Sequence, residues 1–156
     1  MTIHTSFLHQ AIELAVDNVK HSGGPFGAII TLNDMVIATG VNRVTATHDP
    51  TAHAEIVAIR AACTYLNSFQ LTDCILYSSC EPCPMCLGAI YWARPSAVYY
   101  ASSRFDAAAV GFDDSFIYEQ LALPADQRSI ATQQIVTENH AAPFNLWRQT
   151  QEKIEY

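Results

Sequence analysis

Three side chains with the chemistry of zinc ligands lie in two short motifs of this chain. His53 opens the run H-A-E at 53–55, and Cys83 and Cys86 lie in the run P-C-P-M-C at 82–86. One imidazole and two thiolates supply three of the four ligands that a tetrahedral zinc ion prefers, and the fourth position stays open to a water molecule. The sequence therefore predicts one catalytic Zn2+ per chain, bound by His53, Cys83 and Cys86.

Glu55 lies two residues after the histidine. A carboxylate there is poorly placed to bind the same ion but well placed to move protons to and from its water. The alternative is a carboxylate that only stabilises the positive end of a helix dipole. H-x-E and P-C-x-x-C occur together here, as they do in zinc-dependent nucleobase deaminases. We therefore expect Glu55 to be the proton shuttle.

Cys80 makes a second kind of zinc site conceivable, because C-x-x-C-x-x-C with His53 could form a closed, purely structural site. Such a site would leave Glu55 without a task, and Cys80 falls at the end of an expected strand. We therefore expect Cys80 to pack near the metal without binding it. The other histidines have no ligand-like partner in their local sequence: His4, His9, His21, His48 and His140.

The elements that position these motifs alternate between helices and strands. Helices are expected over 1–20, 52–66, 82–92, 115–121 and from 143 onward. Strands are expected over 26–32, 35–41, 74–79 and 97–101, with a further strand around 130–136. This alternation predicts an α/β fold, a three-layer α-β-α sandwich around a mixed, about five-stranded sheet. His53 and Glu55 then begin one helix, and Cys83 and Cys86 share the first turn of the next.

Length and charge restrict the class of protein. The chain has 156 residues, of which 50% are hydrophobic, so we expect a single domain over 1–156. The net charge is −7 with only 8 Lys and Arg, which disfavours a nucleic acid partner. No apolar run reaches the roughly 18 residues of a membrane span. Five cysteines, three of them clustered, suit metal binding in a reducing compartment, so we expect a cytoplasmic protein.

Longer stretches resemble the cytidine and deoxycytidylate deaminase superfamily. Residues 24–28, 49–55 and 80–94 are similar to both bacterial guanine deaminases and tRNA adenosine deaminases, whereas 111–118 and 153–156 resemble the guanine deaminase branch. The resemblance covers nearly the whole chain. It implies a cytidine deaminase-like fold and hydrolytic deamination of a small purine, guanine, to xanthine and ammonia in purine catabolism or salvage.

The resemblance also implies which residues bind the base. Asn42 and the backbone of Ala54 would hydrogen-bond it, and Phe26 and Trp92 would contact its ring. Asn suits this task because its amide carries both a donor and an acceptor. Each assignment has a simpler alternative, since Asn is common in turns and aromatic side chains beside apolar neighbours are usually core.

Two further roles follow from the resemblance. Asp114 would be a second proton-handling carboxylate near the leaving amine, although Asp is also a common helix N-cap. Residues 143–156, ending in Tyr156, would form a lid over an active site, and the lid can be exchanged between the subunits of a homodimer. The apolar stretch 89–100 could supply the dimer interface.

The sequence is also compatible with two alternative functions. Deamination of adenosine in tRNA would use the same zinc chemistry but needs a basic docking face. A zinc-stabilised binding module without catalysis would give Glu55 no task.

Overall fold

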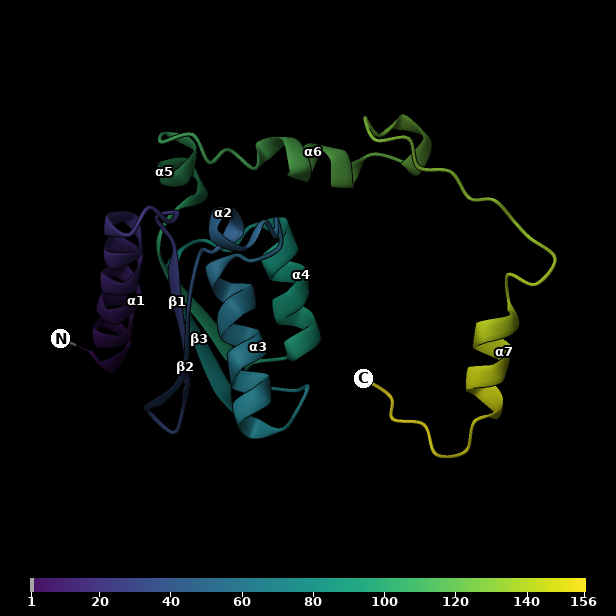
Figure 1. Cartoon of the computed structure of the whole chain (residues 1–156), viewed down its shortest axis with the longest axis horizontal. Helices are drawn as coiled ribbons and strands as arrows, with labels where there is room; N and C mark the ends of the chain where they lie inside the picture. The colour runs from purple at the N-terminus through teal and green to yellow at the C-terminus, as the bar shows by residue number, and fades with distance from the viewer. Residues whose placement is uncertain (1) are drawn as a thin grey trace. The chain divides into compact units, whose positions relative to one another are not determined.

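The computed structural model describes residues 2–156, which divide into two compact units (Figure 1). The first unit runs to Asp114 and contains the sheet, and the second is Ser115–Tyr156.

A mixed sheet forms the centre of the first unit. Its strands are β1 (Gly27–Leu32), β2 (Met35–Val41), β3 (Cys74–Cys80) and β4 (Ala97–Ser102), in the order β2-β1-β3-β4. β1 is antiparallel to both neighbours, whereas β3 and β4 are parallel. The β1–β2 hairpin turns through Asn33 and Asp34, both with positive φ, as a tight two-residue turn requires.

The sheet of the described residues has four strands, so the expected strand around 130–136 is a wrong prediction. That segment has no regular structure, and Ile130, Ile135 and Val136 are all exposed. β-branched residues fit a pleated surface, but an extended segment becomes a strand only when a neighbour pairs with its backbone. The apolar pattern of this segment was therefore not sufficient by itself to form a strand.

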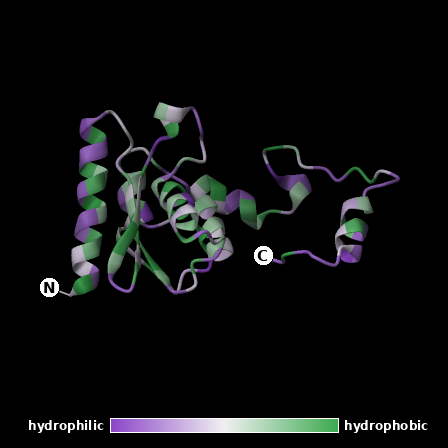
Figure 2. Cartoon of the chain, turned by 60° about the horizontal axis from the view of Figure 1, so that its bottom comes forward, coloured by the Kyte–Doolittle hydropathy of each residue, from purple (hydrophilic) through white to green (hydrophobic). Residues whose placement is uncertain are grey.

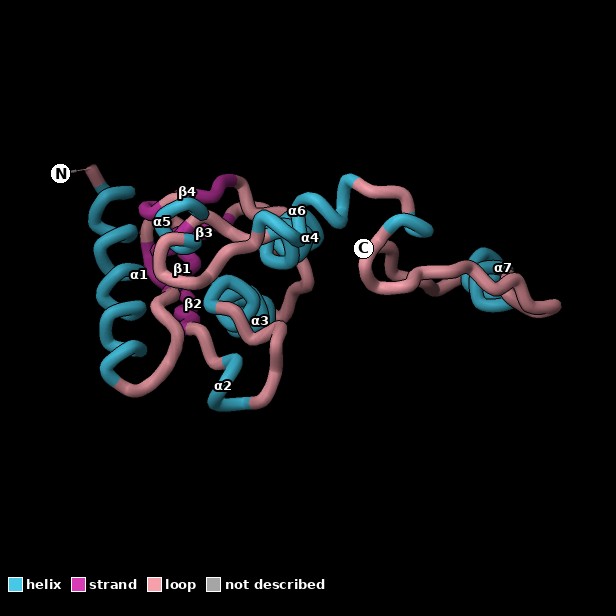
Figure 3. The backbone as a smooth tube through the Cα atoms, turned by 90° about the horizontal axis from the view of Figure 1, so that it is seen from above, coloured by secondary structure: helices cyan, strands magenta, loops and turns pink. Residues whose placement is uncertain are grey.

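Helices cover both faces of this sheet, as predicted. α1 (Ile3–Lys20) lies on one face, and α3 (Ala54–Leu66) and α4 (Pro84–Ala93) lie on the other (Figures 1 and 3). The three-layer α/β prediction is confirmed.

Side chains of β1 point alternately to the two faces of the sheet and contribute to two separate layers of the core. Ile29 packs with Phe7 and Tyr77 beneath α1, whereas Ala28 and Ile30 belong to a larger cluster on the α3 and α4 side. Successive side chains of a strand point to opposite faces, so one apolar strand serves both layers. Figure 2 shows the hydrophobic colouring of the strands between the helices.

The α3 layer lies unusually close to β2. A Cβ at Gly40 would lie 2.2 Å from the carbonyl oxygen of Ala54 and 2.5 Å from the backbone nitrogen of Ala58. Only a residue without a side chain permits this approach. The approach fixes the N-terminal turn of α3, which begins directly after His53.

Two short helices were not expected from the sequence. α2 (Val44–Thr47) follows β2, and α5 (Arg104–Ala108) follows β4. α5 begins with a capping box, in which the side chains and backbone N–H groups of Ser103 and Asp106 bond reciprocally.

The second unit contains α6 (Ser115–Ala122), a 3-10 turn (Ala125–Gln127) and α7 (Ala142–Gln149), which confirms the two helices expected here. None of its residues is buried. No helix within residues 2–156 has the length and hydropathy to cross a membrane.

Candidate active site

The three predicted zinc ligands lie at the N-terminal ends of two helices. His53 is the N-cap of α3 and Cys83 is the N-cap of α4, and both have extended backbone conformations. Pro84 occupies the start of α4, where its fixed φ suits a helix and its missing N–H costs nothing. Cys86 is buried in the first turn of the same helix. Helix N-termini carry positive potential, which favours thiolates.

The ligand atoms converge on one point. Nδ1 of His53 lies 3.5 Å from Sγ of Cys83 and 3.5 Å from Sγ of Cys86, and all three ligand atoms lie within 4.8 Å of one another. Zinc bonds of about 2.3 Å to sulfur and 2.0–2.1 Å to nitrogen, at a tetrahedral angle, separate these atoms by about 3.5 Å. The side chains are therefore arranged to hold zinc.

Cys80 lies outside this group of ligands. Its thiol donates to the carbonyl oxygen of Ser103 at 3.6 Å, and burial raises its pKa to about 11. A protonated thiol with a backbone partner is a packing residue, as the sequence led us to expect.

The pKa values of the two thiols of the site are shifted in opposite directions. A hydrogen bond from Cys86, helped by His53, holds the pKa of Cys83 down to about 4, and the same bond raises the pKa of Cys86. The pKa of His53 is raised mainly by its bond to Cys83. These interactions favour a thiolate at Cys83, which is the form that binds zinc.

Glu55 is buried beside the ligands, with 6% of its surface exposed. Its Oε1 accepts a hydrogen bond from Oγ of Ser78 at 3.2 Å, and its Oε2 lies 3.4 Å from the Cys86 thiol. Burial raises the pKa of the Glu55 carboxyl above its usual value. One oxygen is thus anchored to the sheet while the other faces the ligand cluster.

Ser78 is a residue that reasoning from the sequence missed. It lies in β3, is 1% exposed, and also accepts a weak hydrogen bond from the backbone N–H of Cys80 at 3.4 Å. The available signal was a polar S-S pair at the end of an apolar strand, directly before the cysteine motif.

The candidate base-binding residues Asn42 and Ala54 are both buried. The backbone N–H of Asn42 donates to the carbonyl of Phe26 at 3.1 Å, and its Oδ1 accepts from the N–H of Val44 at 3.3 Å. Phe26 packs edge-on against Phe112, with ring centroids 5.0 Å apart. These contacts join the strand end that carries Asn42 to the loop that carries Phe26.

The remaining candidates lie in different surroundings. Burial raises the pKa of Asp114, and the negative charge of Cys83 raises it further. Trp92 lies in the last turn of α4 and is 64% exposed. Tyr156 ends the second unit and is also exposed. The roles in binding and catalysis stay predictions for all of these residues: Asn42, Ala54, Phe26, Asp114, Trp92 and Tyr156.

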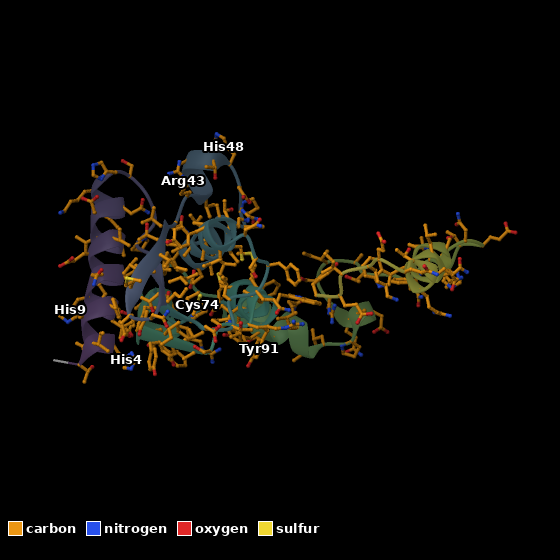
Figure 4. The ribbon with its side chains drawn as sticks, turned by 90° about the horizontal axis from the view of Figure 1, so that it is seen from below. His4, His9, Arg43, His48, Cys74 and Tyr91 are labelled. Atoms are coloured by element: carbon orange, nitrogen blue, oxygen red, sulfur yellow. The ribbon has the colours of Figure 1, made fainter. Side chains whose placement is uncertain are left out.

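The other histidines lie on other elements. Figure 4 shows His4 and His9 on α1, and His48 beside Arg43. His48 is the left-handed C-cap of α2 and is exposed, and His4 bonds to the hydroxyl of Tyr77 at 2.8 Å.

Comparison with known proteins agrees with this geometry. Residues 1–102 match the cytidine and deoxycytidylate deaminase zinc-binding region. The chain belongs to this family. Zinc is therefore its cofactor, and the cluster of one histidine and two cysteines is the place in the structure that fits it.

Relatives within the family differ in how much of this chain they match. Guanine deaminase of Bacillus subtilis is 55% identical over 98% of this chain and 99% of its own length. The X-ray structure of guanine deaminase from that organism has a TM-score of 0.97, covering 100% of this chain and 99% of that one. The tRNA-specific adenosine deaminase of Agrobacterium fabrum is 38% identical over 70% of this chain and 72% of its own length. The resemblance to the guanine deaminase branch is confirmed.

Proposed function

We propose that this family member is a zinc-dependent guanine deaminase, which hydrolyses guanine to xanthine and ammonia. The observation that carries the proposal is the extent of the likeness. Similarity to guanine deaminase covers 98% of the chain, including its C-terminal segment. Similarity to the tRNA-specific adenosine deaminase covers only 70% of the chain. The acidic total charge, −7, also suits a small base better than a polyanion.

Glu55 is assigned the proton transfers. Bound zinc lowers the pKa of its water to about 7 and polarises the reacting group. Glu55 would take a proton from the attacking water and give it to a ring nitrogen of guanine as the water oxygen bonds to C2. It would then take the proton of the new hydroxyl group and give it to the amine, so that the C2–N bond breaks and ammonia leaves. Its buried position supports the role, because burial raises the pKa of the carboxyl above its usual value and so helps it to hold a proton between the two transfers.

Asn42, Ala54 and Asp114 are assigned to the base. The Asn42 amide and the Ala54 backbone hydrogen-bond its edge, with Phe26 against the ring. Asp114 is assigned to the N1–H and the exocyclic amine of guanine, which are adjacent donors. Burial and the negative charge of Cys83 raise the pKa of this carboxyl. Cytosine lacks that N–H, so an acceptor at this place favours guanine.

The second unit supports a homodimer with a lid. Apolar side chains are exposed along its whole length, among them Phe116, Leu121, Phe144 and Ile154. Such a segment gains stability by packing against another surface. We assign residues 143–156 and Tyr156 to a lid that can be exchanged between subunits, and residues 89–100, with exposed Tyr91 and Trp92, to the interface.

We place the reaction in the cytoplasm, within purine catabolism or salvage. All five cysteines are free, which suits a reducing compartment.

Ammonia release by the purified protein tests the proposed function. The substrates are guanine, adenine, cytosine, their nucleosides and tRNA. Guanine is expected to give ammonia and xanthine in equal amounts, and activity confined to tRNA or cytosine would overturn the proposal.

Glu55→Gln is the matched variant for this assay. It keeps the size of the side chain and removes its ability to carry a proton, so turnover should fall by about 100-fold or more. Zinc content, measured by atomic emission, should stay near one per chain. Full turnover by this variant would remove Glu55 from the mechanism.

A further inference from the structure

We propose that Asn18, on α1, is a positioning residue that sets the wall of the base-binding pocket. The inference rests on the proposed function, because it acts through Asn42. Nothing in the sequence motifs singles out Asn18, which lies far from the zinc ligands along the chain.

The amide of Asn18 links the loop before β1 to the residue that directly follows β2. Its Nδ2 donates to the carbonyl oxygen of Gly24 at 2.8 Å and to the carbonyl oxygen of Asn42 at 2.9 Å. One NH₂ group has two hydrogens, so both are used. The side chain thus holds the loop before β1 and the end of β2 at a fixed separation.

The backbone strengthens this link. The carbonyl oxygen of Asn18 accepts from the N–H of Gly23 at 2.8 Å, and the N–H of Asn42 donates to the carbonyl of Phe26 at 3.1 Å. Asn18 therefore bonds to both segments that carry the candidate base-binding side chains, Asn42 and Phe26.

Two glycines allow the loop before β1 to pass close to the side chains of Asn18 and Asn42. A Cβ at Gly23 would lie 2.3 Å from Nδ2 of Asn18, and a Cβ at Gly24 would lie 2.9 Å from Cγ of Asn42. The amide of Asn18 is fixed by its two bonds and has little freedom to yield. The loop, Asn18 and the side chain of Asn42 therefore form one packed layer, in which movement of Asn18 is transmitted to Asn42.

The chemistry of the contact requires a donor. Asn18→Asp keeps the shape but places an oxygen against two carbonyl oxygens, and Asn18→Ala leaves both carbonyls without this partner. Either change should shift Asn42 while leaving His53, Cys83 and Cys86 in place. Within residues 2–156 the hydrogen bonds of Asn18 go to its own helix, to the loop that follows it and to Asn42, and none goes to α3 or α4.

Steady-state kinetics with guanine tests the proposal. Asn18→Ala and Asn18→Asp should raise KM about tenfold, with kcat within about twofold and zinc still near one per chain. Glu13→Ala changes an exposed residue of the same helix and should leave KM unchanged. A purely structural Asn18 would lower the melting temperature or the active fraction without raising KM, and that result would overturn the proposal.

A double-mutant cycle shows whether the effect passes through Asn42. Asn18→Ala combined with Asn42→Ala should raise KM no further than Asn42→Ala alone, whereas multiplying effects would contradict the assignment.

Failure of the proposed function has a separate signature, which is a wild-type protein that makes no xanthine. The placement of Asn18 is then tested by NMR. The amide signals of Phe26 and Asn42 should shift in Asn18→Ala but not in Glu13→Ala, and unshifted signals would overturn the assignment.

Discussion

The two oxygens of the Glu55 carboxylate have different neighbours. Oε1 is bound by a serine hydroxyl of the sheet and Oε2 faces the ligand cluster. A general base needs one oxygen free to move a proton and a fixed orientation for the group as a whole. Ser78 supplies the orientation from a strand, which is more rigid than a loop.

Removing this hydroxyl should weaken catalysis more than binding. Ser78→Ala leaves a buried carboxylate oxygen without its donor, and we expect kcat to fall about 10- to 100-fold with KM and zinc content nearly unchanged. Ser78→Thr keeps a hydroxyl and is the matched control. Wild-type kcat in the alanine variant would show that Ser78 does not position Glu55.

The sequence revealed the residues that act as a motif but not those that support them. His53, Glu55, Cys83 and Cys86 were predicted because close spacing ties each pair to one helix N-terminus. Ser78 reaches Glu55 across 23 positions of the chain, so local spacing does not reveal it. Such contacts depend on how strands and helices pack in three dimensions.

At the scale of elements, contact between β2 and α3 places the first turn of the zinc-binding helix. Gly40→Ala would drive a methyl group against the backbone of Ala54 and Ala58. We expect it to lower the free energy of unfolding by about 1–3 kcal/mol, as overpacking does. The measurement is urea denaturation.

Gly88 provides the matched control. It lies in α4, and a Cβ there would meet nothing within 4 Å. Gly88→Ala should therefore raise the free energy of unfolding by about 0.5–1 kcal/mol, since alanine favours a helix. Equal effects of the two substitutions would contradict the close approach at Gly40.

The capping box of α5 should make that helix sensitive to acid. The side chain of Ser103, with its backbone N–H, holds the pKa of Asp106 below its usual value. Because the folded pKa is depressed, the cap stabilises the fold above the unfolded pKa, about 3.9, and is lost as pH falls through the folded value. Asp106→Ala should lower the melting temperature at neutral pH but not in strong acid. If the melting temperature of Asp106→Ala were lowered equally at every pH, the acid sensitivity of the cap would be refuted.

Helices and strands were predictable where the sequence pattern and the pairing partner both lay close together along the chain. The helices at 52–66 and 82–92 and the β1–β2 hairpin follow from periodicity, proline and turn residues. The segment 130–136 had a strand-like composition but forms no strand in the part of the chain that the structure describes. Strand pairing is a property of the folded chain, so composition alone gave the wrong answer there.

At the scale of the whole molecule, the terminal tyrosine offers a direct test of the lid. Deleting Tyr156 removes one exposed side chain of the second unit and should leave the melting temperature unchanged. If the tail closes over an active site, kcat/KM for guanine should fall about tenfold or more, because closure excludes water and completes the site. Unchanged kinetics would count against the lid.

The second unit has no buried residue, so its apolar side chains are exposed in the single chain. If these apolar side chains are covered by another subunit, the covered state exists only while the subunits are associated. Specific activity should then depend on protein concentration, falling as the sample is diluted and recovering when it is concentrated again. Assays run at very low enzyme concentration would underestimate turnover.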